Sequence, residues 1–179
     1  MQRGQTAGIG FWNNKNGQAL IKALPVVINA DGSVTSVANW LAATMPNTFG
    51  ASAGSNDLAG KSNAYVAVLF QQDFVMKGVK LDAQVLATAL AVYATSVTLD
   101  PTQAAASYGF TVSGDGAGTA TANVGSNGDA FGVANNATLT LVDLLRATDA
   151  QAVNGLLYNG NTTRRNEANN VFSAVNEAG

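Results

Sequence analysis

Hydrophobic residues recur along most of the chain at intervals of three and four positions, the spacing of amphipathic helices. The pattern predicts helices over residues 9–24, 36–45, 62–77, 81–97, 138–153 and 161–178. The first is interrupted at Asn16-Gly17, so we expect a broken helix or a short pair of helices there. The strongest pattern belongs to residues 81–97, whose wide apolar face is that of a central, largely buried helix.

Polar residues mark several of the expected helix starts. Ser62 stands where the side-chain oxygen of an N-cap residue is needed. Thr140 and Asp143 have the spacing of a capping box, with aspartate in place of the usual glutamate, and Thr138 is the alternative start of that helix. These signals place helix boundaries independently of the hydrophobic pattern.

Two stretches have the composition of β-structure instead. Residues 25–34 hold valines and an isoleucine around an Asp31-Gly32 turn, which predicts a small hairpin. A second stretch, about 108–134, alternates short β-like pieces with glycine-rich turns, which predicts a small two- or three-stranded sheet. Its β-like pieces are 110–112, 119–124 and 131–133.

The elements together predict a mainly α protein. We expect one compact helical domain over residues 1–179, helical over 8–100 and 138–178, with the β-rich insertion at about 108–134. A length of 179 residues fits one domain, and a composition that is 47% hydrophobic supplies a real core. No fixed-period repeat and no linker interrupts the pattern.

Composition excludes several classes of function. The chain has no Cys and no His, which excludes thiol catalysis, disulfides, Ser-His-Asp triads, zinc fingers and His-ligated haem. Its net charge is −2, and Arg164-Arg165 is the only adjacent basic pair, which argues against binding of nucleic acid. The two glutamates and most of the nine aspartates stand at helix faces, caps and turns, so we expect them to be structural rather than catalytic.

The pattern also bears on location. The longest apolar stretch, residues 85–93, is too short to span a membrane, so we expect no membrane span. The first residues lack the features of a signal peptide, so the chain is either cytoplasmic or a fragment of a longer exported protein. Only 11% of the residues are charged, and a surface of amides and hydroxyls favours an extracellular setting.

One candidate metal site lies in the expected hairpin. Asn29 and Asp31 occupy the third and fifth positions of an EF-hand loop when Gly32 is taken as the sixth. The first and twelfth positions would be Val27 and Ala38, which cannot ligate calcium through their side chains. A tight turn is therefore the favoured interpretation, and calcium is the alternative.

One candidate ligand site lies near the N-terminus. Trp12 stands beside Asn13, Asn14 and Lys15, and a tryptophan next to amides is a combination that can stack on a sugar ring and bind its hydroxyls. Trp40 is a second aromatic residue that could do the same. For Trp12, a core anchor whose indole N–H is hydrogen-bonded is the favoured interpretation.

Several stretches resemble an uncharacterised module of long secreted bacterial surface proteins, where it follows Ig-like or Cna-B/SdrD-type repeats. The similar stretches include TAGIGFWNNKNGQALI (6–21), KLDAQVLATALAVY (80–93) and RNEANNVF (165–172). The resemblance implies an extracellular or cell-surface location and implies no catalytic residues.

These observations favour a non-enzymatic structural or interaction module of a bacterial surface protein. Its expected partners are other surface proteins or further copies of itself. The alternative is a module that binds glycan or calcium. An enzyme would require a cleft in which an aspartate or glutamate has a clearly raised pKa.

Overall fold

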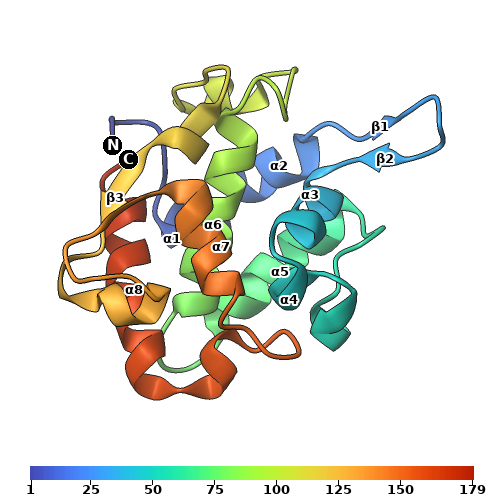
Figure 1. Cartoon of the computed structure of the whole chain (residues 1–179). Helices are drawn as coiled ribbons and strands as arrows, with labels where there is room; N and C mark the ends of the chain where they lie inside the picture. Colours follow the sequence, from blue (N-terminus) through green and yellow to red (C-terminus); the bar gives the residue numbers. More distant parts are fainter.

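Helix α6 (Leu81–Thr95) runs through the middle of the computed structural model, which describes residues 1–179 (Figure 1). Every residue of α6 except Asp82 is buried. The predicted central helix is therefore confirmed, and it is buried on all sides because helices α5, α7 and α8 all pack against it.

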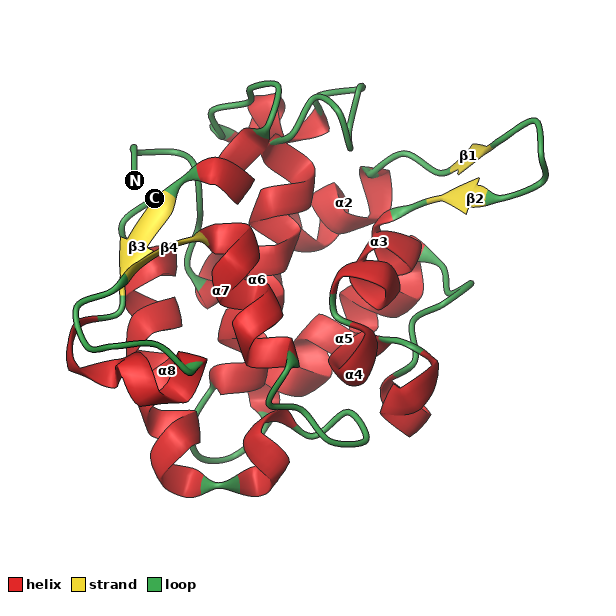
Figure 2. Cartoon of the chain, viewed as in Figure 1, coloured by secondary structure: helices red, strands yellow, loops and turns green.

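The other helices surround α6, and strands occur only at the periphery (Figure 2). The α-helices are α1 (Ile9–Asn13), α2 (Lys15–Ala23), α3 (Val37–Thr44), α4 (Pro46–Phe49), α5 (Asn63–Val75), α7 (Leu141–Asp149) and α8 (Thr162–Glu177). The 3-10 helices are η1 (Ala51–Asn56), η2 (Ala104–Tyr108), η3 (Gly116–Thr119), η4 (Gly125–Phe131) and η5 (Leu157–Gly160). The mainly α fold class is thus as predicted.

The expected break in the first helix separates α1 from α2, but it lies at Asn14 rather than at Asn16-Gly17, which belong to the first turn of α2. The side chain of Asn14 accepts hydrogen bonds from the backbone N–H of Asn16 at 2.8 Å and of Gly17 at 3.2 Å, and so starts α2 as its N-cap. A Cβ on Gly17 would lie 2.2 Å from the carbonyl oxygen of Phe11. Glycine therefore permits the tight packing of these two short helices.

The predicted polar helix starts at Ser62 and Thr140 agree with the structure. Ser62 caps α5 and Thr140 caps α7, each by accepting a hydrogen bond from the backbone N–H three residues further on. Asn161, at the start of the last predicted helix, caps α8 in the same way. The alternative start at Thr138 is wrong, because that residue begins a strand. Helix α7 also ends at Asp149, four residues before the predicted end.

Strands β1 (Val27–Ile28) and β2 (Val34–Thr35) form the predicted hairpin, with Val27 opposite Thr35 in antiparallel register. The hairpin projects from the body of the molecule beside α2 and α3 (Figure 1). The second sheet pairs β3 (Thr121–Asn123) with β4 (Thr138–Thr140), also antiparallel, and lies at the other side of the molecule.

The predicted β-rich insertion is only partly correct. Strand β3 lies inside the expected piece 119–124, but its partner is 138–140 rather than 110–112 or 131–133, neither of which is a strand. Gly132 adopts a left-handed φ of 66°, which no β-strand continues through, and the N–H of Thr111 bonds to the carbonyl of Gly4 instead of to a strand. Two 3-10 helices, η3 and η4, lie within this segment, and η2 ends at its start.

Buried polar side chains tie distant elements together. The carboxylate of Asp149, at the end of α7, accepts hydrogen bonds of 2.8 Å from both the N–H and the hydroxyl of Thr48 in α4. The amide of Asn176 in α8 donates to the backbone and side-chain oxygens of Gln84 in α6. These contacts confirm a structural role for Asp149.

The two ends of the chain lie side by side (Figure 1). The hydroxyl of Thr6 donates to the carbonyl of Val175 at 2.7 Å, so the N-terminal segment is fastened to the last helix. No helix combines the length and the apolar composition that crossing a bilayer requires.

Candidate functional site

Trp12 belongs to the interior. Its side chain is completely buried. It packs edge-on against Phe11, with ring centroids 5.2 Å apart, and at a tilt against Phe110, with ring centroids 5.6 Å apart. The structure therefore confirms a core anchor. Its indole N–H, however, has no hydrogen-bond partner, contrary to expectation.

The residues that follow Trp12 do not form a site with it. Asn14 and Lys15 are exposed and Asn13 is half-buried, and all three line a depression on the surface together with Gln71 of α5. Trp12 does not line that depression. The N-terminal candidates are thus separated into one core residue and three surface residues.

The candidate calcium ligands lie in the turn of the projecting hairpin. The carboxylate of Asp31 accepts hydrogen bonds from the N–H and the hydroxyl of Ser33, at 2.9 and 2.6 Å, and these bonds lower the pKa of Asp31. The amide of Asn29 donates to the hydroxyls of Ser33 and Thr35. Nowhere in the chain do three or more carboxylates come together as metal ligands would.

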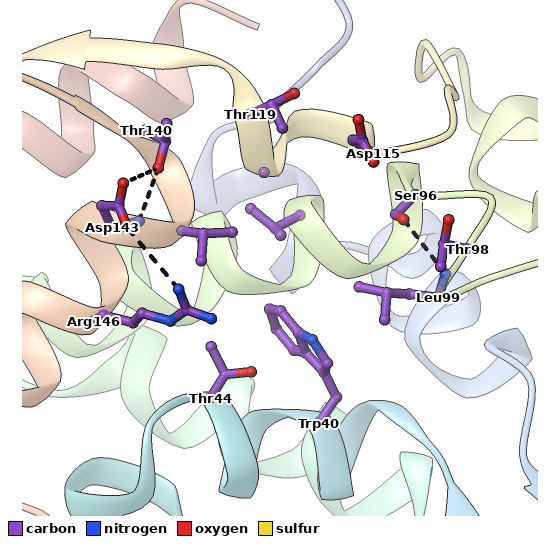
Figure 3. Close-up of a pocket in the computed structure, with 13 residues that line it drawn as sticks. Trp40, Thr44, Ser96, Thr98, Leu99, Asp115, Thr119, Thr140, Asp143 and Arg146 are labelled. Atoms are coloured by element: carbon purple, nitrogen blue, oxygen red, sulfur yellow. Dashed lines mark hydrogen bonds and ion pairs between the residues drawn. The ribbon is translucent and has the colours of Figure 1, made fainter.

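Trp40 is different, because it stands in a cleft of about 380 Å³ that opens to solvent (Figure 3). Its indole is half-buried and packs edge-on against the buried ring of Tyr93, at 5.6 Å between centroids. Helix α3 thus presents Trp40 to the cleft, and α6 fixes the orientation of the indole from behind through Tyr93.

The floor of the cleft is apolar. Val92 of α6 and Val142 of α7 approach each other across Gly118. A Cβ on Gly118 would lie 3.0 Å from Val142 and 3.2 Å from Val92, so a side chain there would crowd both valines. Because Gly118 has no side chain, the space beside the indole of Trp40 stays open.

One wall of the cleft is formed by the start of α7. The hydroxyl of Thr140 donates to the carboxylate of Asp143 at 2.7 Å and accepts from its backbone N–H at 3.1 Å. The guanidinium of Arg146 lies 4.0 Å from the same carboxylate and points toward Trp40 and Thr44 (Figure 3). The helix cap therefore holds a carboxylate and a guanidinium at the rim.

The opposite wall is formed by the loop that follows α6 and by η3. The hydroxyls of Ser96 and Thr98 both donate to the carbonyl of Gly114, at 3.0 and 2.9 Å. Asp115 and Thr119 are exposed at this rim, and neither bonds to another residue that lines the cleft (Figure 3). Their polar atoms are thus available to a molecule bound over Trp40.

Of these residues, only Trp40 was a candidate from the sequence. Asp115, Asp143 and Arg146 come from segments that are distant along the chain, and tertiary packing alone brings them around the indole. The capping box of Thr140 and Asp143 was visible in the sequence, but it indicated a helix start and nothing about a cleft.

A second titratable cluster lies where α5, α6 and α8 meet. Burial, together with the nearby charge of Asp82, raises the pKa of Asp73 to about 7, and Arg165 partly offsets this effect. Asp82 is ion-paired with Arg165. The adjoining cavity, at about 10 Å³, holds no more than a single water, so this raised pKa is not accompanied by a substrate cleft.

Comparison with known proteins adds nothing to this description, since no protein-family model, no curated protein and no solved structure matches the chain. The resemblance to a module of secreted bacterial surface proteins stays a prediction.

Proposed function

We propose that the chain is a non-enzymatic binding module of an extracellular protein, and that the cleft around Trp40 binds a saccharide. The observation that carries the proposal is the indole of Trp40, held half-buried by Tyr93 in an open cleft with polar rims. The amide-rich, charge-poor composition supports an extracellular setting.

The lining suits a sugar for physical reasons. A pyranose has an apolar C–H face, which an aromatic ring covers favourably, and an equatorial belt of hydroxyls, which need donors and acceptors at their sides. The cleft offers that combination, with the indole in the middle, Asp115 and Thr119 on one rim, and Asp143 and Arg146 on the other. Its volume of about 380 Å³ falls within the range of pockets that bind small molecules.

The arrangement favours binding over catalysis. Hydrolysis of a glycosidic bond usually needs one carboxyl group that stays protonated near neutral pH in a desolvated environment. Asp115 and Asp143 are both exposed, and Asp143 already accepts a hydrogen bond from Thr140 and pairs with Arg146. Asp73, whose pKa is raised, lies at another place, where there is no room for a substrate.

The test is titration calorimetry against soluble cello-, xylo-, manno- and chito-oligosaccharides. We expect at least one series to bind, and Trp40→Ala to weaken that binding by tenfold or more. The matched control is Tyr65→Ala, which removes an aromatic side chain that is 42% exposed on α5 and outside the cleft. Absence of binding in every series, or equal affinity of the Trp40 and Tyr65 variants, would contradict the proposal.

A second candidate function, a structural or interaction module, is favoured by a separate feature. The β1–β2 hairpin exposes large apolar side chains that nothing in the chain covers. A protein partner would bury such side chains. The residues around the hairpin indicate which charge the surface of that partner carries.

A further inference from the structure

The projecting hairpin carries four of the large apolar side chains that the fold leaves exposed. Its exposed side chains are Val26 (57%), Val27 (44%), Ile28 (77%) and Val34 (39%). A two-stranded hairpin is only marginally stable by itself in water, and both of its strands have an unpaired edge. Exposed valines and isoleucine on such an element indicate that another surface covers it.

A groove of about 570 Å³ adjoins the hairpin and shows the charge of that surface. Val26 and Val34 form its apolar side, and Lys22 and Lys61 are the only charged residues that line it. The groove is therefore apolar and basic, so it fits a partner surface that carries acidic groups beside apolar ones.

The chain itself supplies charge of the opposite sign, because its charge is unevenly distributed along the sequence. Residues 1–80 hold six basic and three acidic side chains, a net charge of +3, and all five lysines are among them. Residues 81–179 hold three basic and eight acidic side chains, a net charge of −5, which becomes −3 when the buried Asp100 and Asp149 are left out. Elements α2 to α5 with the hairpin lie on one side of α6, β3 and α8 lie on the other side, and α7 overlaps α6 in this view (Figure 1).

We propose that the hairpin and its groove bind the acidic side of a second copy of the chain, in a head-to-tail contact. The apolar hairpin supplies the buried area, and Lys22 and Lys61 are attracted by the acidic side of the neighbouring copy. A two-fold contact of hairpin against hairpin is disfavoured, because it would bring Lys22 and Lys61 of both copies together. A head-to-tail contact leaves the hairpin of one copy free to bind a further copy, so it builds a ring where the rotation between copies closes and an open chain where it does not.

The first test is sedimentation velocity over a concentration series from about 10 μM to 1 mM, at low and at high salt. We expect reversible association that weakens at least threefold when salt rises from roughly 50 to 500 mM, since the attraction is partly electrostatic. Ile28→Ser is expected to weaken association at least tenfold, and Lys22→Glu with Lys61→Glu to weaken it at low salt.

The matched control is Val75→Ser, which removes an apolar side chain that is 72% exposed at the end of α5, away from the groove. Its association should equal that of the unaltered protein. All variants change exposed positions or groove lysines, and equal melting temperatures will show that each is folded. A monomer at every concentration and salt, or association that Ile28→Ser leaves unchanged, would overturn the proposal.

The second test distinguishes the two geometries. The Ile28→Ser variant keeps its acidic side, so in a head-to-tail contact it still receives the hairpin of an unaltered copy. We expect fluorescently labelled Ile28→Ser protein to be recruited by the unaltered protein and, in excess, to shorten its assemblies. Association of the unaltered protein without recruitment of the variant would indicate a hairpin-to-hairpin contact and overturn the head-to-tail proposal.

Discussion

The two tryptophans of the chain have opposite surroundings. Trp12 is enclosed by Phe11 and Phe110, with no exposed surface. Trp40 rests on one buried ring, that of Tyr93, and faces an open cleft with polar rims. The comparison teaches that an aromatic side chain stabilises the fold where its neighbours enclose it, and remains available to a ligand where they support it from one side only.

The largest expected effect is at the enclosed tryptophan. Trp12→Ala leaves a cavity in the aromatic cluster, so we expect a loss of about 3–5 kcal/mol of unfolding free energy. Urea denaturation measures it, with Tyr65→Ala as the control at an exposed aromatic. A loss below about 1 kcal/mol would mean that Trp12 is not a core anchor.

The next largest loss of stability is expected at the interior one of two aspartates of α7, the other of which lies at the cleft. Asp149 is 5% exposed and accepts two hydrogen bonds from Thr48, whereas the side chain of Asp143 is 56% exposed. We expect Asp149→Ala to destabilise the protein by about 3 kcal/mol, because the N–H of Thr48 loses its charged acceptor. Asp143→Ala should cost about 1 kcal/mol or less, because the hydroxyl of Thr140 loses its acceptor and the first turn of α7 loses a negative charge, while Thr140 still caps the helix. Equal melting temperatures of the two variants would show that the buried Asp149 contributes no more to stability than the exposed Asp143.

A third effect concerns the interior carboxyl of Asp73 and depends on pH. Its pKa is about 7 in the folded protein and 3.8 in the unfolded chain, so the folded state binds more protons between these values. The contribution of Asp73 to stability is therefore most favourable in acid and is lost as pH rises from about 4 to 7. We expect Asp73→Asn to remove this loss and to gain about 2 kcal/mol relative to the parent at pH 8, because partial exposure reduces the full effect.

Thermal melts at pH 5 and pH 8 measure this difference between the parent and the Asp73→Asn variant. The variant should have the higher melting temperature at pH 8, and the gap should narrow at pH 5. A gap that does not change with pH would show that Asp73 is not protonated in the folded state at neutral pH.

The smallest effect on stability is expected at the cleft tryptophan. Trp40→Ala removes one edge-on aromatic contact with Tyr93 and a half-buried side chain, so we expect a cost of about 1 kcal/mol. The same substitution should remove most of the saccharide affinity. Urea denaturation of Trp40→Ala and Trp12→Ala measures the difference between the two tryptophans. Similar large losses of unfolding free energy in both variants would contradict the contrast between an enclosed and a cleft tryptophan.

Local signals explain what could be predicted from the sequence. The central helix, the hairpin and the caps at Ser62 and Thr140 rest on spacing and on polar residues next to the elements they start. The pairing of β3 with β4 was missed, because its strands are separated by turns whose left-handed glycines are not evident from hydrophobic spacing.

The candidate site shows the same limit. Trp40 was recognised by its residue type, but its exposure depends on the position of Tyr93, more than fifty residues further along the chain. Asp115 and Arg146 lie still further from it in sequence, in segments that look like an ordinary turn and an ordinary helix face. Trp12, beside amides and a lysine, had the more site-like neighbours in sequence, and the fold buries it.

The most direct test of the cleft is a two-dimensional ¹H–¹⁵N NMR titration of the two indole N–H signals, assigned with Trp12→Phe and Trp40→Phe. A saccharide that binds over Trp40 should shift the Trp40 signal progressively to saturation and leave the Trp12 signal unchanged, because only Trp40 faces the cleft. If no oligosaccharide moves the Trp40 signal at millimolar concentration, or if both signals move equally, the cleft is not the saccharide site.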